Sequence, residues 1–458
     1  MISLVEVAHR MRSGARMGDK EWSMALFQKI TQLVKEYDIQ CPTETSDWQN
    51  TDNSLADAAW QAAVDFVIDM GCFCLNRERV VKFTEAEVKT AIRSMEKEVV
   101  MGAGKDARIW RQHQIEGTEL LNFSPGHHAP FTEDLANLVV QNFAMMPRLD
   151  FIEGFNFLEI DGYDIYGIPI EAYASKRQLA WMREGIRKAG RPGTAIVNYP
   201  ITTAASSFLS TVDPVAGLRP TDGVLLSVLP DVKVEYDLIT VAITLQSYGY
   251  FGISGSFGLV GGFAGGPEGA IVESLAKTLI AWMVYRDNLY YNGVEHLNHV
   301  SGVRRVMDPI HFARSVVYQA TIRNCNGIPM HWPIPVSELC TPSHLQELLL
   351  RSIEAAVNGA NLYVPRVSRA RVNGGQTPAD AELAIEAADA AIKMGIKRSE
   401  VYETFKPIIT KLMNNATPES GKLITECYDL QHHKPSQEYQ VLIDKVKKEF
   451  EDCGLQWE

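Results

Sequence analysis

Aromatic side chains cluster near predicted strand ends, where they could bind a cationic ligand. They are Tyr199, Tyr248, Tyr250, Phe251 and Trp332. A cage of such rings holds a quaternary ammonium group through cation–π attraction, which contributes up to about 2 kcal/mol for each desolvated contact. The alternative interpretation is that the rings fill volume in a barrel core.

Two polar residues accompany these rings. Asn198 precedes Tyr199 at the end of a short apolar run, and His331 lies beside Trp332 in the segment PMHWPIP. A histidine in this position either faces a pocket or is a core histidine with its hydrogen bonds satisfied. The candidate substrate-binding residues are therefore Asn198, Tyr199, Tyr248, Tyr250, His331 and Trp332.

The sequence contains no motif for other common catalytic chemistries. The chain has no serine or cysteine nucleophile elbow, no HExxH and no paired-carboxylate motif. Glu235 and Asp237 lie two residues apart before a predicted strand, where a solvated face or a helix cap explains them equally well. Motifs alone therefore leave the catalytic residues unknown and argue against classical hydrolase chemistry.

Metal binding and disulfides are also not expected. The seven cysteines are scattered and show no CxxC spacing. His296 and His299 could share one face of a helix, but no carboxylate or cysteine joins them within a turn, whereas His127 with His128 and His432 with His433 are merely adjacent. We predict no metal site and no tightly bound cofactor.

A glycine-rich run covers residues 252–270, GISGSFGLVGGFAGGPEGA. Glycines let backbone amides approach a phosphate at a helix start, but the run has neither GxxxxGK nor a properly placed GxGxxG. It is better interpreted as a loop at a barrel mouth that leaves room for a large partner.

Eight candidate strands alternate with amphipathic helical stretches after about residue 150, as expected for repeated βα units. The strands are Phe155–Ile160, Ala195–Asn198, Val224–Leu229, Leu238–Thr244, Tyr248–Ile253, Asn288–Tyr291, Ile328–Trp332 and Asn361–Val364. The expected fold class is α/β, a (β/α)8 TIM barrel over residues 151–415, with an N-terminal helical extension over 1–150 and a C-terminal helix packed on the barrel over 416–458. In such a barrel the active site lies at the carboxyl ends of the strands, which places Asn198 and Tyr199 at the mouth.

The charge composition of the chain limits which kinds of partner it can bind. With 44 basic and 56 acidic residues the net charge is −12, and no long basic run interrupts the chain, which argues against nucleic acid and anionic membranes. The opening residues lack the apolar core of a signal peptide, and no stretch of about 18 apolar residues follows. We expect a cytoplasmic protein.

Several segments resemble the monomethylamine:corrinoid methyltransferases along nearly the whole chain. They are GCFCLNRERVVKFTEAEVKTAIRSMEKEVVMGAGKDA at 71–107, AGRPG at 189–193, GGFAGG at 261–266, SELC at 337–340, and ECYD with PSQEY at 426–439. The resemblance implies a (β/α)8 barrel that assembles as a homo-oligomer, commonly a hexamer. It also implies a methanogenesis-related activity, in which a methyl group passes to the cobalt of a separate corrinoid protein docked at the barrel mouth.

Departures from the family pattern concern the methyl donor. In the family, pyrrolysine on the strand after AGRPG is thought to bind the amine, helped by a glutamate, a glutamine and tyrosines. Here that strand offers Val197 or Asn198, the glutamate position falls near Gly255, and IPMHWPIPV precedes SELC. The resemblance therefore implies a homologue without pyrrolysine.

An N-methylated donor, in particular a quaternary amine, fits these departures because it leaves as a neutral amine without covalent capture. Two alternatives remain. One is an O-methyl or S-methyl donor, activated by an acid or a metal at His331 or Cys340. The other is a non-catalytic barrel that binds a corrinoid protein.

Overall fold

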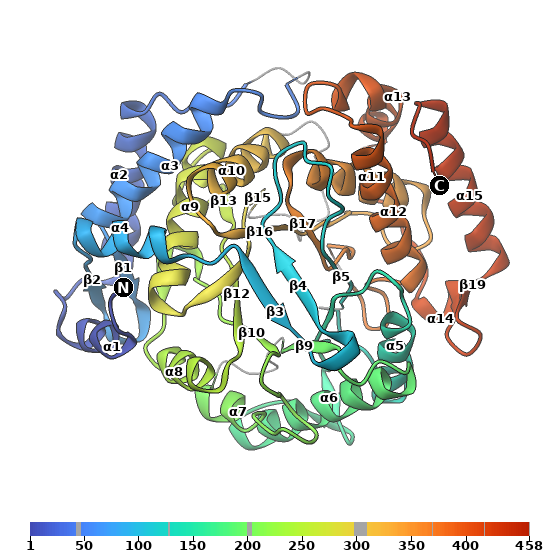
Figure 1. Ribbon diagram of the computed structural model, residues 1–458, viewed down its shortest axis with the longest axis horizontal. Coiled ribbons are helices and arrows are strands. Elements are labelled where there is room, and N and C mark those ends of the chain that lie inside the picture. The colour runs from blue at the N-terminus through green and yellow to red at the C-terminus, as the bar shows by residue number, and fades with distance from the viewer. Residues whose placement is uncertain are drawn as a thin grey trace.

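The computed structural model describes residues 1–42, 47–126, 129–198, 204–296, 309–368, 370–415 and 417–457. Eight parallel strands form the central sheet, in the order β5-β17-β16-β14-β12-β10-β9-β6. A parallel bridge between Gly126 and Glu153 joins its two edges, so the sheet closes into a barrel. The predicted fold class is confirmed (Figure 1).

The barrel strands are short. They are β5 (Phe123–Ser124), β6 (Phe151–Glu153), β9 (Ala195–Asn198), β10 (Gly223–Leu225), β12 (Phe251–Gly255), β14 (Asp287–Tyr291), β16 (Ile328–His331) and β17 (Asn361–Tyr363). Each strand is followed along the chain by a helix of the outer ring. These helices are α5 (Glu133–Ala144), α6 (Ile168–Lys188), α7 (Ala205–Leu209), α8 (Leu238–Tyr248), α9 (Pro267–Val284), α10 (Ile310–Asn324), α11 (Pro342–Asn358) and α12 (Pro378–Met394).

Two of the predicted strands are wrong. Residues 238–244 belong to α8, where Ile239, Ala242 and Leu245 are buried at helical spacing. Its β-branched residues favour a strand, but packing of one face against the barrel overrides that propensity. The predicted strand at 155–160 misses β6, which ends at Glu153, and overlaps only the small hairpin of β7 (Glu159–Ile160) with β8 (Tyr163–Asp164).

The first barrel strand lies inside the range expected as an N-terminal extension. β5 pairs with β17, Leu362 opposite Phe123, so the barrel begins before residue 150. The division into three domains stays a prediction. Ahead of β5 lie α1 (Leu4–Ser13), α2 (Asp19–Glu36), α3 (Asn53–Asp69), β1 (Cys72–Cys74), β2 (Arg79–Val81) and α4 (Glu85–Ser94). β1 and β2 form a small sheet with β11 (Lys233–Val234), which follows β10 in the chain.

The chain after α12 forms an outer layer. It contains α13 (Val401–Asn414), α14 (Ile424–Cys427), the pair of β18 (Tyr428–Asp429) with β19 (Lys434–Pro435), and α15 (Gln437–Asp452). The N-terminal helices and this C-terminal layer lie on opposite sides of the barrel (Figure 1). Within the described residues, no helix is both long and apolar enough to cross a membrane.

A hairpin closes the amino-terminal end of the barrel. It consists of β3 (Glu98–Met101) and β4 (Arg108–Arg111) and crosses the centre of the view in Figure 1. Met101 and Trp110 belong to the same buried cluster as Phe151 in the barrel interior. Only the carboxyl ends of the strands can therefore form an active-site mouth.

The AGRPG segment holds this hairpin. The Ala103 amide donates to the Gly193 carbonyl at 2.8 Å, and the Gly193 amide donates to the Asp106 carboxylate at 3.0 Å. Arg191 lies 3.7 Å from the other oxygen of the same carboxylate. The motif therefore serves the closed end of the barrel, away from the mouth.

Gly193→Ala should destabilise the protein. A Cβ atom at Gly193 would lie 2.1 Å from the carbonyl oxygen of Ala103, so the hairpin would have to shift. We expect a loss of about 1–3 kcal/mol in the free energy of unfolding, measured by denaturant titration. Gly374→Ala is the control, because a Cβ there meets nothing nearer than 3.4 Å. Equal stability of the two variants would contradict this role.

The glycine-rich run is ordered secondary structure over much of its length. It supplies the end of β12, strand β13 (Gly258–Val260) and the turn that leads into α9 at Pro267. β13 pairs in parallel with β15 (Val294–His296). These two strands continue the chain directly beyond β12 and β14, so they form part of the rim of the mouth.

Candidate active site

Three side chains project into the barrel at its open end: Glu153, Tyr291 and Tyr363. Their direction follows from strand periodicity, because residues two apart share a face. Phe151 and Leu289, each two residues earlier, lie in the barrel-interior cluster, which also contains Tyr291 and Tyr363. Trp332 continues the inward face of β16 beyond Met330 and packs on the same cluster.

Four rings form an aromatic wall at this level: Phe257, Tyr291, Trp332 and Tyr363. Tyr291 stacks on Tyr363 with centroids 5.4 Å apart and an interplanar angle of 18°. Trp332 meets Tyr291 edge to face at 5.7 Å, and Phe257 lies 6.0 Å from Tyr291. These are the distances of favourable aromatic pairs, so the rings make one continuous surface.

Small residues make room for the wall. A Cβ at Gly255 would come within 2.2 Å of the Tyr291 hydroxyl. The Ser227 hydroxyl lies 3.3 Å from the same oxygen and is hydrogen-bonded to it. Packing against Tyr291 thus requires glycine at position 255.

Glu153 lies at the end of the wall and is only 1% exposed. The Tyr363 hydroxyl donates a short hydrogen bond to its carboxylate. A Cβ at Gly126, two residues beyond the end of β5, would lie 2.6 Å from the Glu153 Cβ, so this position must be glycine. The site therefore combines one buried carboxylate with a surface of aromatic rings.

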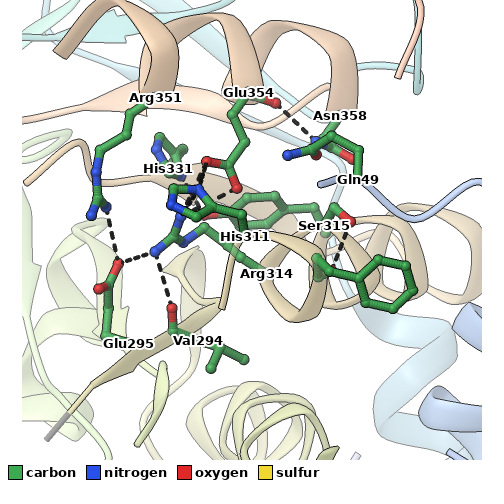
Figure 2. A network of polar contacts seen from close by, with 12 residues as sticks. Gln49, Val294, Glu295, His311, Arg314, Ser315, His331, Arg351, Glu354 and Asn358 are labelled. Carbon is green, nitrogen blue, oxygen red and sulfur yellow. Dashed lines mark hydrogen bonds and ion pairs between the residues drawn. The ribbon is translucent and has the colours of Figure 1, made fainter. Parts of the chain in front are cut away.

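A buried polar network joins α10, α11 and β15 (Figure 2). Arg314 on α10 contacts Glu354 on α11 at 3.1 Å and Glu295 on β15 at 2.5 Å, and also donates to the Val294 carbonyl. Arg351 lies 3.5 Å from Glu295. The network thus ties the strand just beyond Tyr291 to two helices of the outer ring.

The same helix holds the strand that precedes Trp332. Tyr318, one turn after Arg314, has its hydroxyl 2.7 Å from His331 Nδ1. Burial lowers the pKa of His331 well below its usual value, so the ring is neutral. Arg314 and Tyr318 therefore position the two strand ends that carry Tyr291 and Trp332.

Tyr318→Phe should cost about 1 kcal/mol in the free energy of unfolding, because a buried hydrogen bond is lost and His331 Nδ1 is left without this donor. Denaturant titration measures the loss. Tyr166→Phe is the control, since Tyr166 is 86% exposed and should change nothing. An unchanged stability of Tyr318→Phe would mean that His331 is held by other contacts.

Of the predicted site residues that the structure describes, only Trp332 lies on the inner surface of the mouth. Asn198 and His331 lie at the correct strand ends but face the helix layer, Asn198 toward Thr211 at 3.5 Å and His331 toward Tyr318. Tyr199 lies outside the described residues.

Tyr248 and Tyr250 lie at the other end of the barrel. Tyr248 ends α8 and is 56% exposed, and Tyr250 immediately precedes β12, where its hydroxyl donates to the Leu218 carbonyl at 3.1 Å. Their expected position at the mouth is therefore corrected. The error arose because residues 238–244 were predicted as a strand. The residues that follow them were therefore expected at its carboxyl end, which is the side of the mouth.

Sequence reasoning missed Glu153, Phe257, Tyr291 and Tyr363. Tyr291 and Tyr363 lie in correctly predicted strands, but the alternation of side chains along a strand does not by itself tell which face points into the barrel. Glu153 was missed because the predicted strand began two residues after it.

Cys340, which precedes the Thr341 cap of α11, was an alternative activating group. Its pKa is lowered by the neighbouring Cys427 thiol and by Lys422, although burial acts in the opposite direction. Within the part of the chain that the structure describes, no group of three or more His, Cys, Asp or Glu side chains is arranged to hold a metal ion. His127, His128 and His299 are not among the described residues.

The fold and the aromatic rings at the carboxyl ends of its strands define a TIM-barrel enzyme. The family model for monomethylamine methyltransferase MtmB matches residues 2–455, and the chain belongs to this family of methyltransferases. Monomethylamine methyltransferase MtmB of Methanosarcina mazei is 25% identical over 453 residues, covering 97% of this chain and 96% of its own length. MtmB1 of Methanosarcina barkeri is 24% identical with the same coverage.

The solved structures agree on the fold. The crystal structure of the Methanosarcina barkeri monomethylamine methyltransferase superposes with a TM-score of 0.91 at 22% identity, covering 99% of this chain and 98% of that one. The structure of a hydroxylamine complex of MtmB gives a TM-score of 0.90.

Proposed function

We propose that the protein transfers a methyl group from an N-methylated amine, in particular a quaternary one, to the cobalt of a separate corrinoid protein, without pyrrolysine. The observation that carries the proposal is the aromatic wall of Phe257, Tyr291, Trp332 and Tyr363 at the open end of the barrel, next to the Glu153 carboxylate. Such a surface favours a bulky organic cation.

The chemistry requires little from the protein when the donor is quaternary. The carbon–nitrogen bond breaks as a carbon–cobalt bond forms, cobalt supplies the electron pair, and the nitrogen keeps the pair of the broken bond. A neutral tertiary amine leaves, so no proton is transferred. The enzyme's residues then have to orient the donor and exclude water.

The described end of β9 supports a donor that needs no covalent capture. Val197 lies in the barrel-interior cluster, and Asn198 faces the helix layer. Neither side chain is a nucleophile or a strong electrophile, so neither could activate a poor leaving group. A donor whose nitrogen is already a good leaving group suits this site.

Family membership supports the corrinoid partner. The homologues are named monomethylamine methyltransferases, and the resemblance implies acceptance of the methyl group by a corrinoid protein at the mouth. The proposal includes a cytoplasmic homo-oligomer of the hexameric kind that the resemblance implies.

Anaerobic incubation with cob(I)alamin tests the proposal. The protein is mixed with tetramethylammonium, choline, trimethylamine or monomethylamine, and the absorbance of cobalt is followed. We expect methylation of cobalt from a quaternary donor that depends on the enzyme. A reduced corrinoid protein then replaces cob(I)alamin as the natural class of acceptor.

Two results would overturn the proposal. Methylation only from an O-methyl or S-methyl compound would replace the donor class. Binding of a corrinoid protein without turnover of any N-methyl donor would indicate the non-catalytic alternative.

A further inference from the structure

Two cysteines from motifs far apart in the chain meet where the C-terminal layer packs on the barrel. They are Cys340, the last residue of SELC, and Cys427 of ECYD, and both are free thiols in the structure. The Cys427 thiol is hydrogen-bonded to the Cys340 sulfur. The proposed methyl transfer from an N-methylated donor uses neither residue, so that reaction does not explain the contact.

Backbone hydrogen bonds bring the two segments together. The Glu338 amide donates to the Glu419 carbonyl at 3.0 Å. The Lys422 amide donates to the Leu339 carbonyl, also at 3.0 Å. The chain just before Cys340 therefore runs beside the chain that leads into α14.

Cys427 is held at the end of α14. Its amide donates to the Leu423 carbonyl at 3.3 Å, and its sulfur lies 3.3 Å from the same oxygen. Its own carbonyl accepts a hydrogen bond from the Ser436 amide at 2.8 Å. The Cys427 side chain is buried, whereas Cys340 is partly exposed. A reagent in solution therefore reaches Cys340 first.

The surroundings make Cys340 the more reactive thiol. Its pKa is lowered by the hydrogen bond from Cys427 and by the nearby Lys422 ammonium, although burial acts in the opposite direction. The pKa of Cys427 is raised by its hydrogen bond to Cys340 and by burial. The thiolate is the form that attacks a disulfide. The pair therefore combines an accessible attacking sulfur with a buried second sulfur beside it.

We propose that Cys340 and Cys427 are a modification site, at which a small-molecule disulfide such as oxidised glutathione converts the two thiols into an intramolecular disulfide. Two sulfur atoms that already share a hydrogen bond need little movement to reach bonding geometry. The bond joins the segment that follows β16 to the C-terminal layer. In a reducing compartment such a bond is transient. The proposal does not depend on the methyl transfer reaction.

The reaction is a two-step exchange. The Cys340 thiolate attacks one sulfur of the glutathione disulfide, which forms a mixed disulfide and releases one glutathione thiolate. The Cys427 thiol then loses its proton and attacks the Cys340 sulfur, which releases the second glutathione thiolate. The two protein thiols lose two electrons, which the glutathione disulfide gains. Their two protons pass through solvent to the two glutathione thiolates.

Peptide mapping of the whole protein tests the proposal. The protein is equilibrated with mixtures of reduced and oxidised glutathione, free thiols are blocked with N-ethylmaleimide, and the peptides are identified by mass spectrometry. We expect a cross-linked Cys340–Cys427 peptide that becomes the main form when oxidised glutathione is in excess and that disappears after treatment with dithiothreitol.

The stability of the cross-linked protein provides a second readout. The bond closes a long loop of chain, so the oxidised protein should unfold at a temperature about 3–5 °C above that of the reduced protein. Equal unfolding temperatures of fully oxidised and fully reduced protein would show that the bond does not hold the C-terminal layer on the barrel.

Single variants test the order of the two steps. In Cys427→Ser, glutathione should stay attached to Cys340, because the thiol that displaces it is missing. In Cys340→Ser, the buried Cys427 should stay unmodified. Cys453→Ser is the control, because Cys453 is also partly exposed and its loss should leave the cross-link unchanged. Thermal unfolding of each variant shows whether it is folded.

Two results on the unaltered protein would overturn the proposal: Cys340 and Cys427 both still free in excess oxidised glutathione, or Cys340 cross-linked to a different cysteine. Glutathione attached to Cys427 in a folded Cys340→Ser would overturn the assignment of Cys340 as the attacking thiol.

Discussion

Exchanging Arg314 for methionine should lower the free energy of unfolding by about 3–5 kcal/mol, the largest loss that we expect from one substitution. Arg314 is 1% exposed and contacts both Glu295 and Glu354. Without it, the fully buried Glu354 carboxylate would lose its arginine partner, and breaking a buried ion pair by removing one partner costs this amount. Denaturant titration measures the effect.

The matched control lies on the same helix. Arg323 pairs with Asp57 where both side chains are partly exposed, 32% and 43%, so Arg323→Met should cost at most about 1 kcal/mol. If both variants lose similar free energies of unfolding, the buried network around Arg314 does not stabilise the fold more than an exposed ion pair does.

Acid sensitivity provides a second readout of the same variant. Burial alone would raise the pKa of Glu354, but Arg314 and His311 outweigh it and hold that pKa well below its usual range. A carboxyl with a depressed folded pKa stabilises the fold above the unfolded pKa of about 4.3 and loses this contribution as the pH falls further. Arg314→Met should therefore lose less of its stability than the unaltered protein between neutral pH and the region below about pH 4.

Replacing Tyr291 with leucine should weaken the apparent affinity for a quaternary donor roughly 30-fold, because about 2 kcal/mol of cation–π attraction is lost. Tyr291 is in contact with the other three rings of the wall. The measurement is the donor concentration that gives half-maximal methylation of cobalt, with choline binding by calorimetry as a check.

Tyr291→Phe is the matched control for this prediction. It keeps the ring face and loses only the hydroxyl, which is hydrogen-bonded to Ser227, so the affinity should fall at most a few-fold. If leucine and phenylalanine behave alike, the ring at this position contributes no cation–π attraction to the donor.

The sequence predicts the architecture well where local signals are strong. Thr377 before Pro378 and Thr341 before Pro342 are strong local signals for helix starts, and both threonines cap their helices. The predicted strand that ends at Asn198 is correct. These elements succeed because capping residues and short buried apolar runs act locally.

The failures have physical causes. β5 has two residues and β6 has three, too few to show a period. α8 consists largely of β-branched and apolar residues, and only its contact with the barrel makes it a helix. Because one strand was placed in a helix and another began late, Tyr248 and Tyr250 were expected at the mouth and Glu153 was overlooked.

The pairing of distant residues in the site could not be predicted from one sequence. Glu153 meets Tyr363 across the closure of the barrel, and Arg314 joins β15 to α11. Such contacts depend on tertiary packing and leave no local pattern. Trp332 was found because it lies at a predicted strand end and faces inward.

Transfer of an isotopically labelled methyl group tests the central claim most directly. The protein is incubated anaerobically with cob(I)alamin and a tetraalkylammonium donor carrying carbon-13 in its methyl groups, and both products are followed by nuclear magnetic resonance. The account predicts labelled methyl on cobalt and an equal amount of tertiary amine, formed only when enzyme is present. Unlabelled cobalt and intact donor, with folded protein and active cob(I)alamin, would contradict it.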